Sequence, residues 1–263
     1  MISSYFQGGL GNQLFQIAAA VSLAADNNDT AVFNLAHHDL PKQGRKCYNY
    51  VESILRNVNF SDSYQITKIY KEPTFSYKSI PYEPDLCLVG YFQSEKYFIN
   101  NKEIIKELFS IDDTSNALIE EKYAEVLAKK PVSVHIRRGD YLSSQGVHPV
   151  CSKEYYRRAF EAFNAGSSET TSFLFFSDDI EWCKENFVGD NYYFAQDNED
   201  YIDLYLMSKC AHHIIANSSF SWWAAWLNDN PERRVVAPDR WFGGLDKHET
   251  KDLRPDDWES VGC

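Results

Sequence analysis

The second half of the chain alternates short apolar runs with longer amphipathic stretches. The apolar runs lie at 131–137, 172–176, 191–195, 212–216 and 233–238, and the amphipathic stretches at 152–163, 179–187, 201–210 and 219–228. The runs have the length of buried strands and the stretches have helical spacing. Strands that alternate with helices predict βαβ units and a doubly wound parallel sheet.

The first half opens with a strand, a turn and a helix, and then becomes less regular. The pattern predicts a strand at 2–6, a glycine-rich turn at 7–12 and a helix at 13–25, followed by strands at 31–35 and 87–92 and helices at 103–109 and 112–130. The last helix ends before Pro131, where we expect a domain boundary. The expected protein is therefore α/β, with domains at 1–130 and 131–263.

Composition and charge restrict the class of partner. The 263 residues are 44% hydrophobic and 15% aromatic, which is typical of a globular core. A formal net charge of −12 argues against nucleic-acid and anionic-membrane partners, so an anionic ligand needs a local basic pocket. No segment has the ~18 to 20 apolar residues that cross a bilayer, and the N-terminus lacks the basic start of a signal peptide. We expect a soluble protein.

The cysteines and histidines do not have the spacing of a metal site. Six cysteines are dispersed without a C-x-x-C pair, so reduced thiols are expected rather than a zinc site or a disulfide framework. The pairs His37-His38 and His212-His213 would point to opposite faces of an extended chain. No Asp-x-Asp occurs, and the hypothesis is a reaction without a metal cofactor.

The run HIRRGDY at 135–141 stands where an apolar strand meets a loop. Strand alternation places His135 and Arg137 on one face and Arg138 on the other. A guanidinium offers a planar pair of donors that suits a phosphate. Arg137 could therefore contact an anionic ligand while Arg138 supports the scaffold. An internal ion pair with Asp140 is the structural alternative.

The glycine-rich turn at 8–13, GGLGNQ, lies between the first strand and the first helix. Gly9 and Gly11 would let the backbone approach a ligand, and the helix N-terminus presents free N–H groups. The spacing is not G-x-G-x-x-G and has no P-loop lysine, so it does not identify a nucleotide. A plain tight turn is the alternative, with Asn12 as a helix cap.

Two further polar motifs follow apolar runs. NSSFSWW at 217–223 opens a helix, which Asn217 or Ser218 could cap. Alternatively, the hydroxyls of Ser218 and Ser219 and the N-terminal amides could bind phosphate, while the nearby tryptophans suit a core. Asp178 and Asp179 end the run FFSDD, where Asp178 and Glu181 resemble a capping box that would leave the second carboxylate free. A carboxylate can accept two parallel hydrogen bonds from the edge of a guanine.

Five blocks together resemble the α-1,2-fucosyltransferases: GGLGNQLFQIAAA at 8–20, GYFQSEKYF at 90–98, HIRRGDYL at 135–142, FFSDD at 175–179 and NSSFSWWAAWL at 217–227. The resemblance implies a GT-B-like fold of two Rossmann-like halves, with the donor site in the cleft between them. It also implies GDP-β-L-fucose as donor, a galactose-containing glycan as acceptor, inversion at the anomeric carbon and no metal or other cofactor. The N-terminal half would be the acceptor side and the C-terminal half would bind the GDP-sugar.

The resemblance also assigns roles to residues of the five blocks. Arg137 would contact the donor diphosphate and Arg138 would support it. Asn12 would lie near the fucose, and Asp140 is the candidate base, or else a partner of Arg138. The remaining donor-binding candidates are His135 with Asp178 or Asp179 at the guanine, Ser218 and Ser219 at phosphate, and Gly9 and Gly11.

Three alternatives to this function remain at the level of the sequence. The first is a transferase of the same fold with another donor or linkage, and the second is a non-catalytic GDP-sugar or glycan-binding module. A dinucleotide-dependent oxidoreductase is disfavoured by the glycine spacing. The chain resembles microbial family members that build surface glycans from the cytoplasm, and its sequence does not indicate an oligomeric state.

Overall fold

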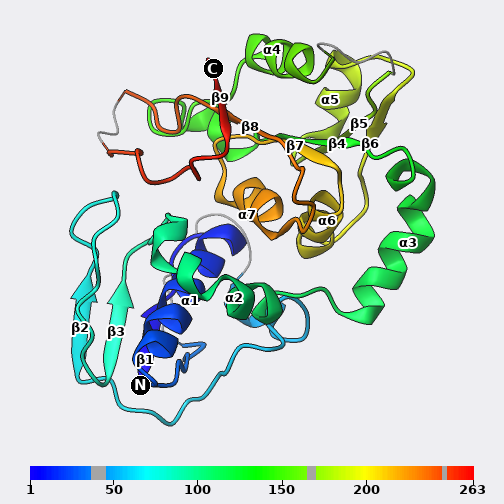
Figure 1. Cartoon of the computed structure of the whole chain (residues 1–263). Coiled ribbons are helices and arrows are strands. Elements are labelled where there is room, and N and C mark those ends of the chain that lie inside the picture. Colours follow the sequence, from blue (N-terminus) through cyan, green and yellow to red (C-terminus); the bar gives the residue numbers. More distant parts are fainter. Residues whose placement is uncertain (37–45, 165–169, 245–247) are drawn as a thin grey trace. The chain divides into compact units, whose positions relative to one another are not determined.

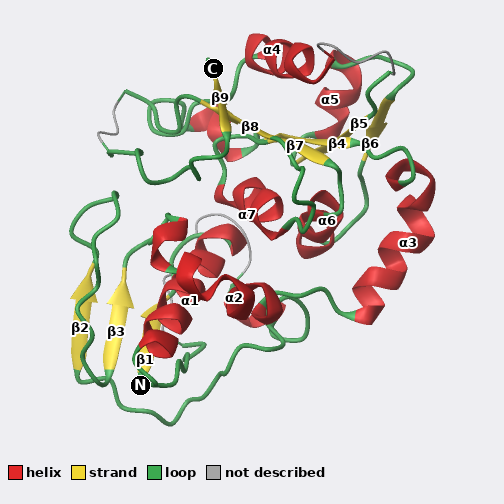
Figure 2. Cartoon of the chain, in the orientation of Figure 1, coloured by secondary structure: helices red, strands yellow, loops and turns green. Residues whose placement is uncertain are grey.

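The computed structural model describes residues 1–36, 46–164, 170–244 and 248–263, which form two compact units. The first unit contains Met1–Asp112 and His248–Pro255, and the second contains Asp113–Lys247 and Asp256–Cys263. Both units contain helices and strands (Figure 2). The α/β class expected from the sequence is therefore observed in each unit.

The first unit is built on a parallel sheet with strand order β1-β3-β2. Its elements are β1 (Ile2–Tyr5), α1 (Leu10–Asp26), the 3-10 helix η1 (Cys47–Tyr50), β2 (Lys68–Lys71), β3 (Leu86–Val89), η2 (Glu95–Tyr97), η3 (Ile99–Asn101) and α2 (Lys102–Leu108). Helix α1 is apolar along most of its length and packs against β1. The carboxyl end of β1 therefore leads directly into the glycine-rich turn.

Two expectations for the first unit need correction. The expected strand at 31–35 makes only isolated bridges, from Ala31 to Ile2 and from Phe33 to Phe60. Strand β2 was not expected, because its sequence KIYK is mostly exposed and lacks an apolar run. Charged residues on an edge strand are a common protection against pairing with another chain, and they hide the strand from an analysis of hydrophobic pattern.

The second unit contains a six-stranded sheet in which every pairing is parallel. Its elements are α3 (Asp113–Leu127), β4 (Val132–Ile136), the 3-10 helix η4 (Asp140–Ser143), α4 (Lys153–Asn164), β5 (Phe173–Ser177), α5 (Ile180–Asn186), β6 (Tyr192–Phe194), α6 (Asp200–Ser208), β7 (His212–Ile214), α7 (Ser219–Leu227), β8 (Val235–Pro238) and β9 (Glu259–Val261). The strand order β6-β5-β4-β7-β8-β9 is that of a Rossmann sheet. Its order reverses between β4 and β7, which is where such sheets bind ligands.

Strand β4 divides its side chains between the two faces of this sheet. Val134 and Ile136 lie in a core cluster with residues of α4 and α5, which cover one face in Figure 1, while α6 and α7 cover the other. Ser133 and His135 point to the α7 side, where the Nδ1 atom of His135 lies 2.8 Å from the Oγ atom of Ser221. The alternation expected from the sequence is confirmed.

The boundary between the units lies before α3 and not at Pro131 as expected. Lys122 of α3 donates from Nζ to the carbonyl oxygen of Gln196 at 2.7 Å, and the Nδ2 atom of Asn198 donates to the hydroxyl of Tyr123 at 2.7 Å. These bonds and the packing of α3 on α6 make the helix part of the second unit. The proline ends a helix within the unit rather than a domain.

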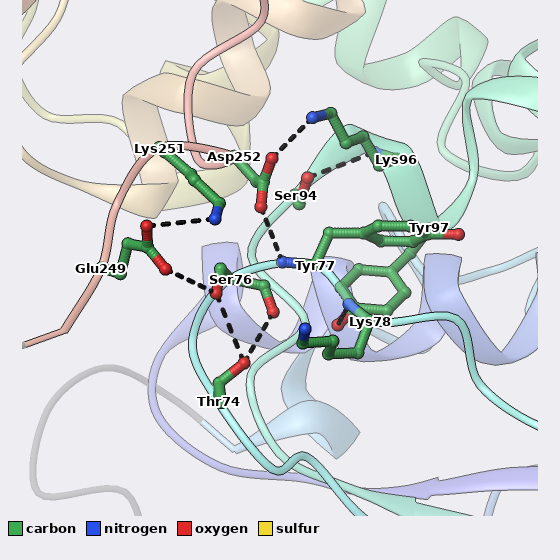
Figure 3. A network of polar contacts seen from close by, with 10 residues as sticks. All are labelled: Thr74, Ser76, Tyr77, Lys78, Ser94, Lys96, Tyr97, Glu249, Lys251 and Asp252. Carbon is green, nitrogen blue, oxygen red and sulfur yellow. Dashed lines mark hydrogen bonds and ion pairs between the residues drawn. The ribbon is translucent and has the colours of Figure 1, made fainter.

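A segment near the C-terminus, 248–255, returns to the first unit through the polar network of Figure 3. Asp252 accepts from the Nζ atom of Lys96 at 2.5 Å and from the backbone N–H of Tyr77 at 3.0 Å. Glu249 accepts from the hydroxyl of Ser76 at 3.2 Å. The C-terminal domain expected at 131–263 is therefore interrupted, because these contacts tie the segment to residues of the first unit.

The remaining expectations about the fold concern cysteines and single segments. All six cysteines are free, and five of them are buried. The pair His37-His38 and most of the loop expected at 165–172 lie outside the described residues. Among the helices of the described part of the chain, none is long and apolar enough to cross a membrane.

Candidate active site

Polar side chains gather at the carboxyl ends of β4, β5 and β7, which are neighbours in the second unit. Arg137 and Arg138 follow β4, Asp178 and Asp179 follow β5, and Ser218 follows β7. Carboxyl ends of parallel strands meet at one edge of a sheet, and open α/β sheets bind ligands beyond those ends where the strand order reverses, here between β4 and β7. The structure thus brings together the candidates that the sequence placed in this half of the chain.

Arg137 lies between two carboxylates. Its Nη2 atom is 2.6 Å from Oδ1 of Asp140 and its Nη1 atom is 3.0 Å from Oδ2 of Asp178. About a quarter of the side chain is exposed, and its Cζ atom lies 5.6 Å from the centre of the Tyr141 ring. The two arms of the guanidinium therefore each face one oxygen, an arrangement that two oxygens of a diphosphate could also adopt.

Asp140 forms an ion pair with Arg137 but no hydrogen bond with it. Both of its carboxylate oxygens are buried and, among the described residues, neither receives a hydrogen bond, so the 2.6 Å contact with Arg137 is an ion pair without hydrogen-bond alignment. A buried carboxylate oxygen without a donor is costly in a folded protein. The oxygens could accept a proton from a ligand, or a hydrogen bond from one of its hydroxyl groups.

Arg138 holds the scaffold behind Arg137. Its Nε atom donates to Oδ2 of Asp179 at 2.9 Å, its backbone N–H donates to Oδ1 of Asp178 at 2.9 Å, and its Cζ atom lies 3.7 Å from the centre of the Trp182 ring. The supporting role expected for Arg138 agrees with these contacts. The alternative that Asp140 pairs with Arg138 is wrong, because Asp179 is the carboxylate that pairs with it.

Gly139 allows this cluster to close. A Cβ atom added at Gly139 would lie 2.6 Å from Oδ2 of Asp178, and that oxygen is the one that faces Arg137. Any larger residue would push Asp178 away from the arginine. The glycine between Arg138 and Asp140 is therefore a requirement of packing in the site.

His135 is buried beneath the cluster. Its Nδ1 atom lies 2.8 Å from the hydroxyl of Ser221, and its ring centre lies 5.7 Å from that of Phe220. Burial, followed by the positive charge of Arg137, lowers the pKa of His135 to about 4. The imidazole is therefore neutral at pH 7 and connects β4 to the first turn of α7.

The segment after β7 is held from several sides. The Oγ atom of Ser218 caps α7 by accepting from the backbone N–H of Phe220 at 3.3 Å. The hydroxyl of Tyr141 donates to the carbonyl oxygen of Asn217 at 3.0 Å, and the amide of Asn217 donates to the backbone oxygens of Pro149 and Trp241. Capping by Ser218 is thus observed, and Ser219 begins the helix beside it. The capping box expected from Asp178 and Glu181 is wrong, because Asp179 is the N-cap residue of α5, without a side-chain cap, and Asp178 accepts from the backbone of Arg138. Three tryptophans of α7 are buried in the core: Trp222, Trp223 and Trp226.

His212 and His213 serve the fold. His213 lies 2.8 Å from the hydroxyl of Ser133 through Nδ1 and 2.7 Å from the Nδ2 atom of Asn228 through Nε2, whereas His212 stacks on Phe163. The two rings point to opposite faces, as the sequence predicted. Within the described residues, no three His, Cys, Asp or Glu side chains form a group that could hold a metal ion.

Asn12, Gly9 and Gly11 belong to the first unit. Gly9 is the N-cap residue of α1 and Gly11 is buried within the helix. Gly8 has a φ of +71°, and a Cβ atom there would lie 2.2 Å from the Nδ2 atom of Asn12. The Oδ1 atom of Asn12 accepts from the Nε2 atom of Gln93 at 2.7 Å. In this turn the backbone therefore passes close to the Asn12 amide, and the Asn12 side chain does not cap the helix.

Sequence reasoning missed four residues that hold these clusters: Tyr141, Trp182, Ser221 and Gln93. Tyr141, Ser221 and Gln93 lie inside the five blocks, but no rule of spacing reveals their contacts. Outside these clusters, burial raises the pKa of the Asp203 carboxyl on α6 to about 6. Asp203 is one of two acidic residues in the first turn of α6, so the local sequence does not distinguish it.

Comparison with known proteins decides the family. The model of the family described as glycosyl transferase family 11 matches residues 46–252. The chain belongs to glycosyl transferase family 11. This glycosyltransferase is 33% identical to the alpha-1,2-colitosyltransferase of Escherichia coli over 89% of its own length and 90% of the relative. It is 31% identical to the O-antigen biosynthesis glycosyltransferase WbnK of Escherichia coli, over 97% and 98%.

A further relative of this family 11 enzyme is the galactoside alpha-(1,2)-fucosyltransferase 1 of Leontocebus fuscicollis, 29% identical over 85% of the chain and 64% of the relative. Among solved structures, NodZ alpha-1,6-fucosyltransferase soaked with GDP-fucose has a TM-score of 0.58 at 14% identity, covering 90% of this chain and 94% of NodZ. POFUT1 in complex with GDP has a TM-score of 0.51 at 10% identity, covering 90% and 97%. The GT-B-like fold expected from the sequence is confirmed.

Proposed function

We propose that this family 11 glycosyltransferase transfers L-fucose from GDP-β-L-fucose to the 2-hydroxyl of a terminal galactoside, with inversion and without a metal. The observation that carries the proposal is Arg137 at the reversal of strand order in the second unit, with one donor arm directed at each of two acidic oxygens. The relatives named for alpha-1,2 transfer support the linkage.

The leaving group sets the demand on the protein. As the bond from fucose C1 to the diphosphate oxygen lengthens, negative charge develops on GDP. Donors already aimed at that charge stabilise the transition state more than the ground state. In this proposal a diphosphate replaces Asp140 and Asp178 on the two arms of Arg137. Ser218, Ser219 and the N-terminal amides of α7 would supply further donors.

Inversion requires the acceptor hydroxyl to attack from the face opposite GDP. Asp140 is the proposed base, because its buried oxygens have no hydrogen-bond donor among the described residues and could accept the hydroxyl proton. Such a base typically contributes ~10²- to 10⁴-fold. The role proposed for Asn12 is to contact the sugar, with Gly9 at the N-cap of the same helix and Gly11 inside its first turn.

The contacts of the other candidates favour positioning roles. Asp178 holds Arg137 and the backbone of Arg138, and Asp179 holds the Arg138 guanidinium. Contact of either carboxylate with guanine stays a prediction. His135, neutral and bonded to Ser221, is proposed to fix the start of α7 beside the nucleotide.

A second donor is favoured by one specific observation, the similarity to an alpha-1,2-colitosyltransferase. Colitose is L-fucose without its 3-hydroxyl, so GDP-colitose is the alternative donor. The acceptor proposed is a galactose-containing glycan precursor, which the similarity to an O-antigen biosynthesis glycosyltransferase supports.

Calorimetry with a panel of donors tests the nucleotide and the sugar separately. We expect GDP-fucose to bind more tightly than UDP-galactose, and its turnover with a galactoside to exceed that of GDP-mannose and GDP-colitose. Faster turnover of GDP-colitose than of GDP-fucose would make GDP-colitose the proposed donor. Tighter binding of UDP-galactose would overturn the proposal of a GDP-sugar site.

A further inference from the structure

Two side-chain amides meet at the carboxyl edge of the sheet in the first unit. Strands β1 and β3 are parallel neighbours, so the residues that follow them lie at the same edge. Asn12 stands in the first turn of α1 after β1, and Gln93 stands in the loop after β3. The Nε2 atom of Gln93 donates to Oδ1 of Asn12 at 2.7 Å. This bond fixes which way the Asn12 amide is turned, with its oxygen toward Gln93.

The backbone around the pair is closely fitted. On one side, a Cβ atom at Gly8 would collide with the Asn12 amide nitrogen at 2.2 Å. On the other, Glu72 accepts hydrogen bonds from the backbone N–H groups of Tyr91 at 2.7 Å and Phe92 at 3.1 Å. Because Glu72 holds the two residues immediately before Gln93, the position of the glutamine is set by the fold.

The loop carries further signs of this constraint. Phe92 has a φ of +51°, in a backbone region that residues other than glycine rarely adopt. A Cβ atom at Gly90 would lie 2.4 Å from the Cβ atom of Glu72. Strained backbone of this kind persists only where the surrounding structure imposes it, and such positions cluster at binding sites.

Gln93 keeps an acceptor that the described residues do not use. The residue is 7% exposed, and its Oε1 atom is buried without a hydrogen-bond donor among the described residues. Gln16 in the same unit shows the usual arrangement: its Oε1 accepts from the backbone N–H of Gln7 at 3.0 Å and its Nε2 donates to the Gln7 carbonyl at 3.1 Å. A buried carbonyl oxygen without a donor is uncommon and costly.

We propose that Gln93 determines substrate specificity by reading one ring hydroxyl: it orients the Asn12 amide through Nε2, and its Oε1 accepts a hydrogen bond from that hydroxyl. The inference rests on the proposed function, since the hydroxyls available are those of a donor deoxyhexose and an acceptor galactoside. An amide pair suits this task, because a hydroxyl both donates and accepts a hydrogen bond. Both sugars offer the same chemistry, and the experiment distinguishes them.

The test is a cycle that combines removal of the amide with removal of single substrate hydroxyls. Wild-type protein, Gln93→Leu and Gln93→Met are assayed with GDP-fucose and its 2-, 3- and 4-deoxy analogues, and with methyl β-galactoside and its 3-, 4- and 6-deoxy analogues. For one hydroxyl we expect its removal from the substrate to lower kcat/KM of the wild-type protein at least about tenfold. In Gln93→Leu, kcat/KM for that deoxy analogue should be almost the same as for the parent substrate. The source of that analogue identifies the sugar.

Gln16→Leu is the matched control, because it removes a buried glutamine amide that the backbone already satisfies. We expect it to lower the melting temperature while keeping the wild-type ratio between parent and deoxy substrates. Gln93→Met keeps the length of the side chain but has no amide, so it should lose the discrimination even where Gln93→Leu folds poorly. GDP affinity should stay at the wild-type value in both Gln93 variants.

Suppose that the wild-type protein transfers fucose, but that for every analogue the effect of removing the Gln93 amide is independent of the effect of removing the hydroxyl. That result would overturn this inference and leave the proposed function standing. Absence of transfer by wild-type protein would overturn the proposed function instead. In that case the side-chain amide NMR signals of Asn12 and Gln93 are followed during titration with methyl β-galactoside and with L-fucose. Signals that do not shift with either sugar would overturn the inference as well.

Discussion

Replacement of Arg137 by lysine tests the proposed diphosphate contact while keeping the positive charge. In the structure the two arms of the guanidinium reach separate oxygens, at 2.6 Å to Asp140 and 3.0 Å to Asp178. A lysine ammonium is a single nitrogen on a flexible stem and cannot reproduce a planar fork. In Arg137→Lys at least one of the two donors to the diphosphate is therefore lost.

The expected effect follows from the value of one such donor. A hydrogen bond to a charged group contributes ~1.5 to 3 kcal/mol, and loss of one donor to a developing oxyanion reduces turnover ~10²- to 10³-fold. We therefore expect kcat for fucose transfer to fall by about that factor, measured as GDP release with a galactoside acceptor. Circular dichroism should show a folded protein, because the charge beside Asp140 and Asp178 is kept.

A matched control separates this effect from a general response to losing a guanidinium. Arg157 on α4 also contacts two carboxylates, Glu154 and Glu161, but it is 55% exposed and lies outside the cluster. Arg157→Lys should keep wild-type turnover, since exposed ion pairs contribute little. Turnover of folded Arg137→Lys within a few-fold of the control would refute the reasoning.

Three other predictions concern the base, the metal and the pH. Asp140→Asn should keep GDP affinity, because in the proposed complex the diphosphate takes the place of residue 140 on Arg137, but it should lose ~10²- to 10⁴-fold in turnover. A parallel loss of affinity would make Asp140 a positioning residue. Transfer should survive EDTA, and restoration of lost activity by added Mn²⁺ or Mg²⁺ would contradict the metal-free mechanism. Burial and Arg137 lower the pKa of His135 to about 4 from 6.5, so below pH 6.5 the unfolded chain binds a proton that the folded chain excludes. The free energy of unfolding should fall by about 3 kcal/mol between pH 6.5 and pH 4 through this residue, and urea titrations of His135→Asn should lack that part.

Much of the second unit could be predicted because its strands are buried on both faces. Runs such as that of β5 (Phe173–Ser177) are apolar throughout, and the helices between them have clear amphipathic spacing. The alternation along β4 also predicted that Arg138 and His135 leave the strand on opposite faces. Arg138 does stack on Trp182 of α5, and His135 does contact Ser221 of α7.

The parts that could not be predicted depend on contacts between distant positions. Asp252 joins the first unit through Lys96 and the backbone of Tyr77, and nothing in the local sequence at 248–255 indicates those partners. The boundary before α3 likewise depends on hydrogen bonds from α3 to Gln196 and Asn198.

Within the candidate site, the sequence predicted the residue types and not their pairing. It placed acidic and basic groups at the ends of neighbouring strands, but it could not decide that Asp179 holds Arg138 while Asp140 and Asp178 hold Arg137. Gln93 was part of a quoted block without a role, because its significance lies in one bond to Asn12 and one unsatisfied oxygen.

The most direct test of the proposed function is the structure of the product. Wild-type protein is incubated with GDP-β-L-fucose and a β-galactoside in the presence of EDTA, and the product is analysed by NMR. The account predicts an α-linked fucose on the galactose 2-hydroxyl, formed with equimolar GDP. A β-linked product, attachment at another hydroxyl, or release of GDP without a disaccharide would contradict it.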